Sequence, residues 1–167
     1  MNSRQALALL WITILNQSQS SSIVIKNMPI LFDRLKIDEE FKVIPYEQIC
    51  YAMTTPTSLH RFPRKMSKYL AESLITINDR FKMCPVDVFS VRQEILSNLL
   101  LFSGIGEHKA NIAIYIYDCI LGHEIYGTKH LRCNISEEDV IAEISYINSL
   151  GKSASNSNIC CRSKGIF

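Results

Sequence analysis

Several features that would assign a protein class at once are missing from this sequence of 167 residues. No apolar run reaches the roughly 18 to 20 residues that a membrane-spanning helix needs, so we expect no membrane association. Alternation of apolar and polar residues with period two is nowhere sustained, and no internal repeat occurs, so neither strands nor a repeat array are predicted. The net charge is only +2 at pH 7, which permits a nucleic-acid partner but argues against a dedicated high-affinity binder.

The cysteines lack the spaced pairs that metal sites use. Their distances are irregular, no Cys-x-x-Cys pattern occurs, and the late pair is adjacent; the six are Cys50, Cys84, Cys119, Cys133, Cys160 and Cys161. We therefore expect no structural zinc and no iron–sulfur cluster, and so no cofactor. A metal site from His123, His130 and Cys133 is also disfavoured, because their spacing fits no standard pattern. Buried free thiols in a cytoplasmic protein are the predicted state.

The beginning of the sequence resembles a signal peptide without completing the pattern. Arg4 precedes the apolar run Ala6 to Leu15. The following residues, Asn16 to Ser20, are polar and contain no small-x-small cleavage pattern. We therefore predict a buried central helix rather than a secretion signal, and a cytoplasmic location.

What the sequence does contain is helical periodicity. Hydrophobic residues are 47% and charged residues 20%, as in a folded globule, and we predict an all-α fold. The expected helices cover residues 5–15, 21–35, 46–53, 63–77, 91–101, 107–121 and a last segment after Ser136. Pro29 predicts a boundary or kink in the second of them. One domain, residues 1–152, is expected, followed by a poorly ordered tail at 153–167, with the protein a monomer.

The last segment has its own start and stop signals. Ser136 is typical of an N-cap, and the three acids after it suit the positive end of a helix dipole. Gly151 predicts the end of the helix. The expected apolar stripe consists of Val140, Ile141, Ile144 and Ile147.

Two glycines interrupt a region that is otherwise helical. Gly104-Ile105-Gly106 lies between apolar segments, within a predicted helical hairpin at residues 95–121. Glycine takes turn angles that side chains resist, so we predict a tight turn. The next helix would present unpaired N–H groups and its positive dipole end at this turn, which is a site for phosphate. Lys109 is unfavourable in a first helical turn, and an anion nearby would offset that cost. The alternative is a plain connection with Lys109 in solvent.

The stretch Leu101 to Asn111 resembles the helix-hairpin-helix of the DNA glycosylase superfamily, which includes endonuclease III and the adenine glycosylases. Ser103 stands where that family usually has proline. A second segment, Ile14 to Ser20, is similar to the family's early segment, in which a glutamine reaches the DNA from the end of a buried helix. The resemblance extends over roughly residues 5 to 122.

The resemblance implies a helical bundle that bends double-stranded DNA and flips one nucleotide. The enzyme would hydrolyse the N-glycosidic bond of an altered base during base excision repair. The residues implied to contact DNA are Gln17, Gln19, Ser103, Gly104, Ile105, Gly106, His108 and Lys109. The basic residues His60, Arg61, Arg64, Lys65 and Lys68 either contact backbone phosphates or form a solvated face. Trp11 is expected in the core, or alternatively at a base pocket.

Two departures from the family bear on catalysis. His108 occupies the position of the family's Schiff-base lysine, so an active enzyme would be monofunctional, without strand cleavage. The family's catalytic aspartate is missing, because residues 125–132 contain no acid. Glu124 is the candidate acid, and Asp118 is expected at the surface. The alternatives are a catalytically inactive DNA-binding module or, less favoured, a scaffold for protein contacts.

Overall fold

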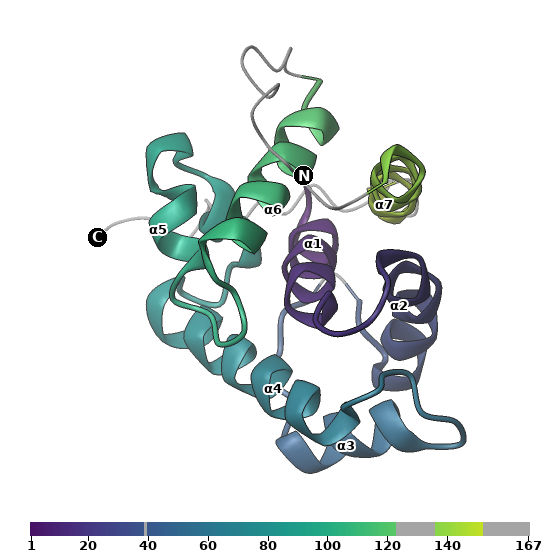
Figure 1. Cartoon of the computed structure of the whole chain (residues 1–167). Helices are drawn as coiled ribbons and strands as arrows, with labels where there is room; N and C mark the ends of the chain where they lie inside the picture. Colours follow the sequence, from purple (N-terminus) through teal and green to yellow (C-terminus); the bar gives the residue numbers. More distant parts are fainter. Residues whose placement is uncertain (39, 123–135, 152–167) are drawn as a thin grey trace.

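A computed structural model describes residues 1–38, 40–122 and 136–151, and within these ranges the protein is all-helical (Figure 1). The α-helices are α1 (Ser3–Leu15), α2 (Ser21–Leu35), α3 (Tyr46–Thr54), α4 (Pro63–Arg80), α5 (Ile95–Leu99), α6 (Glu107–Ile120) and α7 (Glu137–Gly151), with the 3-10 helices η1 (Pro85–Phe89) and η2 (Arg92–Glu94). No helix in these ranges is long and apolar enough to cross a membrane. The predicted all-α class is confirmed, whereas the predicted tail lies outside the described residues.

Helix α1 is the centre of the fold. Every residue from Gln5 to Leu15 is buried, as the nearly continuous apolar sequence predicts. Helices α2, α4, α6 and α7 and the 3-10 helix η1 all contact α1, and Figure 1 shows them arranged around it. The Gln5 side chain also joins α1 to α7, because its Nε2 donates to the Ile147 carbonyl at 3.0 Å. Side chains that bond to the ends of α1 are therefore anchored to the element on which the other helices pack.

Trp11 belongs to this core. Its side chain is fully buried, its Nε1 donates to Ser73 Oγ at 3.0 Å, and its ring packs edge-on against Phe32. A buried indole needs such a partner for its N–H. The core placement expected for Trp11 is confirmed.

Two helices differ from expectation. Helix α2 runs through Pro29 from Ser21 to Leu35, so the boundary predicted there is wrong. Proline costs about 3 kcal/mol inside a helix, and burial of Met28, Leu31 and Phe32 on the face of α2 that enters the core offsets that loss. The helix predicted over 91–101 is instead divided into η2 and α5.

Helix α7 begins as predicted but presents a different face to the core. The Ser136 hydroxyl accepts from the Asp139 amide at 3.1 Å, which confirms the N-cap. Ile141, expected in the apolar stripe, is 59% exposed, and Glu143 and Leu150 are buried with Val140 and Ile147.

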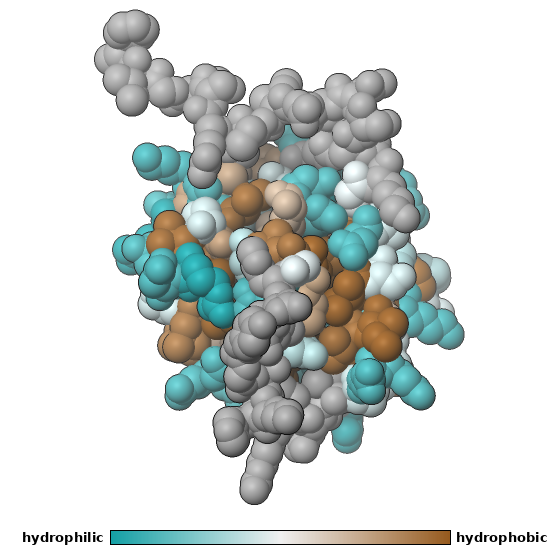
Figure 2. Space-filling view, turned by 90° about the horizontal axis from the view of Figure 1, so that it is seen from above, coloured by the Kyte–Doolittle hydropathy of each residue, from teal (hydrophilic) through white to brown (hydrophobic). Residues whose placement is uncertain are grey.

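Seen from the end of the bundle where the chain begins, apolar residues reach the surface in patches between polar ones (Figure 2).

Candidate nucleic-acid interface

The turn between α5 and α6 requires glycine at one position. Gly104 has φ +86, and a Cβ on it would lie 2.8 Å from Cδ2 of Tyr69, a residue of α4. Gly106 differs, because its φ of −101 is open to any residue and a Cβ there would meet nothing within 4 Å. The prediction that the turn needs glycine angles is confirmed for Gly104 and wrong for Gly106. Gly106 leaves open space where a side chain would otherwise stand.

That open space lies over the start of α6. Gly106 is the N-cap of this 14-residue helix, and it offers no side-chain acceptor. The helical ladder begins with the Ala110 amide, which donates to the Gly106 carbonyl at 3.0 Å. The amides of residues 107–109 precede that bond and have no carbonyl acceptor within their own helix. Together with the positive dipole end, they form an N-terminus suited to an anion.

Lys109 points inward rather than toward this anion position. Its Nζ donates to the Ile14 carbonyl at 3.1 Å and to the Gly104 carbonyl at 3.0 Å. Burial, aided by the positive charge of Lys65, lowers the pKa of Lys109 to about 8, so the amine is largely protonated at neutral pH. An ammonium at the negative end of α1 is favourable. Lys109 thus fastens the glycine turn to the end of the central helix.

His60 supports the same end of α1. Its Nε2 lies 3.0 Å from the Leu15 carbonyl, and its Nδ1 accepts from the Phe62 amide at 3.0 Å. Both contacts are satisfied by the neutral tautomer with the proton on Nε2. Burial lowers the pKa of His60 accordingly. His60 is 4% exposed, so its predicted place in a phosphate-binding cluster is wrong: it has a structural role.

The two glutamines predicted to reach DNA have different surroundings. Gln19 is held on both sides, since its Oε1 accepts from the Arg61 amide at 3.0 Å and its Nε2 donates to the Leu59 carbonyl at 3.4 Å. The Gln17 Oε1 is buried and has no hydrogen-bond partner within the described part of the chain. Buried polar atoms are normally paired, so Gln17 is the glutamine with capacity left for a ligand.

The remaining residues predicted to contact DNA differ in their exposure to solvent. Ser103 and His108 are exposed, whereas the Ile105 side chain is buried and leaves only its main chain for a ligand. Sequence reasoning assigned no role to Tyr69, although this side chain forms the wall behind Gly104. The sequence signal available for it was its place within the helix predicted over residues 63–77.

An exposed cation of α4, Lys65, lies beside the glycine turn. The Lys65 Nζ is 5.5 Å from the centroid of the Tyr69 ring, the ring against which Gly104 packs. Arg64 is exposed in the first turn of α4, and Arg61 is exposed just before this helix, where its main-chain amide contacts Gln19. We call the start of α6, the turn at 104–106 and these three cations the turn surface. Segments far apart in the sequence are thereby joined around the end of α1.

Two carboxylates on or beside α6, Asp118 and Glu143, are buried, whereas Glu107 is exposed in the first turn of this helix. Asp118 is 9% exposed, and its Oδ2 accepts from Arg92 at 2.7 Å, so the surface position predicted for it is wrong. A long-range ion pair makes this burial tolerable. Glu143 is 2% exposed, and burial, with a smaller effect of Asp139, raises the pKa of its carboxyl to about 8. Glu124, the predicted catalytic acid, lies outside the described residues, as do His123, His130 and Cys133.

The turn surface carries no cluster of metal ligands. In the described ranges, no group of three His, Cys, Asp or Glu side chains is placed to hold a metal ion. The chain matches no protein-family model, no curated protein and no solved structure. A function therefore has to be drawn from the turn surface itself and from the motifs of the sequence.

Proposed function

We propose that the protein binds double-stranded DNA through the turn surface, as a helix-hairpin-helix protein of the DNA glycosylase type. The observation that carries the proposal is the uncapped start of α6, which Gly106 leaves open, with the exposed Lys65 of α4 near the same turn. Amide N–H groups at a helix start donate to a phosphate oxygen, and lysine and arginine neutralise neighbouring phosphates. The resemblance of residues 101–111 to the family's hairpin supports the same partner.

The affinity expected from such a surface is modest. Three exposed cations, Arg61, Arg64 and Lys65, are available to neutralise phosphates. Each phosphate neutralised contributes about −0.9 to the slope of log affinity against log salt, so a slope of about −3 is expected. This fits the small net charge of +2. Binding is then measurable at low salt and lost near physiological salt.

Removing single cations tests this surface. Arg64→Gln and Lys65→Gln should each weaken duplex binding and reduce the salt slope by about 1. Lys26→Gln, which removes an exposed charge from α2, is the matched control and should leave the slope unchanged. Fluorescence anisotropy of a labelled duplex across a salt series measures all four proteins. Salt-independent binding would favour a scaffold for protein contacts over a DNA-binding protein, and equal slopes in every variant would show that Arg64 and Lys65 contact no phosphate.

Base excision is the activity we propose for this DNA-binding scaffold. Hydrolysis of an N-glycosidic bond requires a carboxylate that stabilises the positive charge growing on the sugar. We propose Glu124 for that role and a monofunctional reaction, because Lys109 is engaged with two carbonyls and the family's lysine position holds His108. The second candidate function is a DNA-binding module without cleavage. It is supported by the pairing of Asp118 with Arg92 and by the burial of Glu143, because both keep a carboxylate away from a bound sugar.

One experiment separates these two functions. The protein is incubated with duplexes that each carry a different damaged base, and abasic sites are scored. Base release that disappears in Glu124→Gln supports the glycosylase and its acid. Duplex binding with no release from any lesion supports the binding module.

A further inference from the structure

A cavity of about 340 Å³ lies at the end of α1 opposite the turn surface. Its wall combines the first turn of α1, the second half of α2 and the second half of α7. Arg4 on this wall is ten residues before Ile14, the residue that Lys109 contacts, and a helix rises about 1.5 Å per residue. The cavity is therefore about 15 Å from the proposed DNA contact. Its volume falls within the range of small-molecule sites.

Two residues of the cavity wall each carry a buried polar atom without a partner. Arg4 Nε and the Tyr146 hydroxyl are both buried, and neither has a hydrogen-bond partner within the described ranges. Unpaired polar atoms are uncommon inside proteins and costly by about 1 to 3 kcal/mol each. The guanidinium carbon of Arg4 lies 5.8 Å from the centroid of the Phe32 ring, which holds the cation in place.

Tyr146 supplies a hydroxyl donor beside this cation. Burial raises the pKa of Tyr146 to about 12, against the opposing influence of Arg4, so its O–H keeps its proton under physiological conditions. A guanidinium N–H and a neutral phenol O–H are both donors, and both suit an oxyanion. The guanidinium has no acceptor and would repel a cation.

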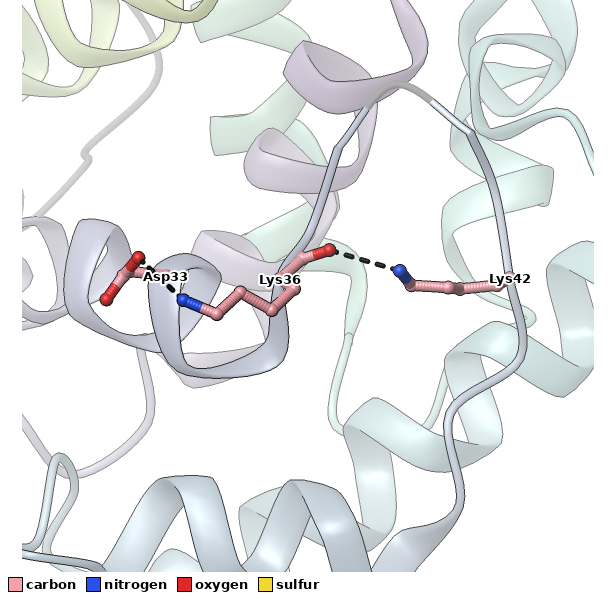
Figure 3. A network of polar contacts seen from close by, with 3 residues as sticks. All are labelled: Asp33, Lys36 and Lys42. Carbon is pink, nitrogen blue, oxygen red and sulfur yellow. Dashed lines mark hydrogen bonds and ion pairs between the residues drawn. The ribbon is translucent and has the colours of Figure 1, made fainter.

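The acids near the cavity are matched by lysines of their own. Asp33 Oδ1 pairs with Lys36 Nζ at 3.3 Å, and Asp38 Oδ2 pairs with Lys42 Nζ at 3.8 Å. Lys42 Nζ also donates to the Lys36 carbonyl at 3.1 Å, and Figure 3 shows the Asp33–Lys36–Lys42 chain of contacts. These side chains are exposed, where ion pairs are weak and water screens them. Each of these two acids thus has a lysine partner, whereas Arg4 takes part in no ion pair within the described ranges.

We infer that this cavity binds a small organic anion, whose carboxylate or phosphate accepts from Arg4 and Tyr146. The body of the ligand lies against the apolar part of the wall, formed by Phe32, Ile37 and Leu150. Charge-assisted bonds to the oxyanion would satisfy both unpaired donors. This site is separate from the turn surface and does not depend on DNA binding.

Nuclear magnetic resonance of the Arg4 Nε–H signal in the full chain tests the site directly. The probes are benzoate and phenyl phosphate, which carry the two kinds of oxyanion on the same ring, and benzyl alcohol, which carries none. One or both anions should shift the Arg4 signal in a saturable way, with a dissociation constant near or below about 1 mM. Whichever anion binds more tightly identifies the headgroup class.

Variants of the two donors provide the second arm. Arg4→Lys keeps the charge but removes the planar guanidinium donor, and Tyr146→Phe removes only a hydroxyl. Each should weaken binding of the tighter anion by about tenfold. Arg80→Lys and Tyr51→Phe, both at exposed positions, are the matched controls and should bind as wild type does.

Three results would overturn the inference. They are no saturable shift with either anion at roughly 10 mM, benzyl alcohol binding as tightly as the anions, or unchanged affinity in Tyr146→Phe. The last variant guards against a folding artefact, because loss of an unpaired hydroxyl leaves the packing of α7 in place.

Discussion

Gly104→Ala should lower the free energy of unfolding by about 3 kcal/mol. Two costs combine in this estimate. A residue with a Cβ loses about 1 to 2 kcal/mol in the left-handed region, and Gly104 has φ +86. The added methyl would also lie 2.8 Å from Tyr69 Cδ2, and relief of such overpacking typically costs about 1 to 3 kcal/mol.

Gly106→Ala is the matched control for this prediction, because it adds the same methyl group two residues away. The backbone of Gly106 is extended, and its added Cβ meets nothing within 4 Å. Urea denaturation of both variants should show a large shift in midpoint for position 104 and a loss of no more than about 1 kcal/mol for position 106, where alanine is a poorer N-cap than glycine. Equal losses at the two glycines would mean that the turn has a different geometry.

Glu143→Gln should make the protein more stable than wild type at alkaline pH, by up to about 5 kcal/mol. Burial raises the pKa of the Glu143 carboxyl in the folded protein to about 8, from an ordinary value of 4.5. The folded state therefore binds a proton that the unfolded chain releases, so wild-type stability is complete below about pH 4.5 and decreases as pH rises to about 8. A difference of one pKa unit corresponds to about 1.4 kcal/mol, and glutamine, which has no such proton, escapes the loss.

Chemical denaturation at about pH 5 and about pH 9 measures this difference. The stability of Glu143→Gln relative to wild type should increase between the two conditions. Glu138→Gln, on the exposed first turn of α7, is the control and should show little change. A constant offset between wild type and Glu143→Gln at both pH values would show that the Glu143 carboxyl does not carry an unusual proton.

Local sequence patterns predicted the helices well. The bounds of α2 agree with the prediction, and those of α4 and α6 differ by a few residues. The start of α7 could be predicted because Ser136 and the acids after it form an N-cap, which depends only on neighbours in sequence. The same holds for Gly104, whose turn is a local backbone requirement.

The long-range contacts of polar residues could not be predicted from the sequence. Asp118 is buried because Arg92, which is 26 residues away, pairs with it. His60 is buried because its two ring nitrogens meet main-chain groups of Leu15 and Phe62. Glu143 lies on the core face of α7 with Val140, Ile147 and Leu150, and a search for apolar periodicity passes over a glutamate at such a position. In the candidate site, the glycine turn was predicted, whereas the inward direction of the Lys109 side chain was not.

Binding of Gly106→Asp to duplex DNA tests the central claim most directly. An aspartate at this N-cap would accept from the open amides of α6 and suit its dipole, so protein stability should rise by up to about 1 kcal/mol. The same carboxylate would occupy the phosphate position and repel DNA, so affinity at low salt should fall at least about tenfold, while Gly106→Ala binds like wild type. Wild-type affinity in a folded Gly106→Asp protein would contradict the account, because the amides at the start of α6 would then have no part in holding DNA.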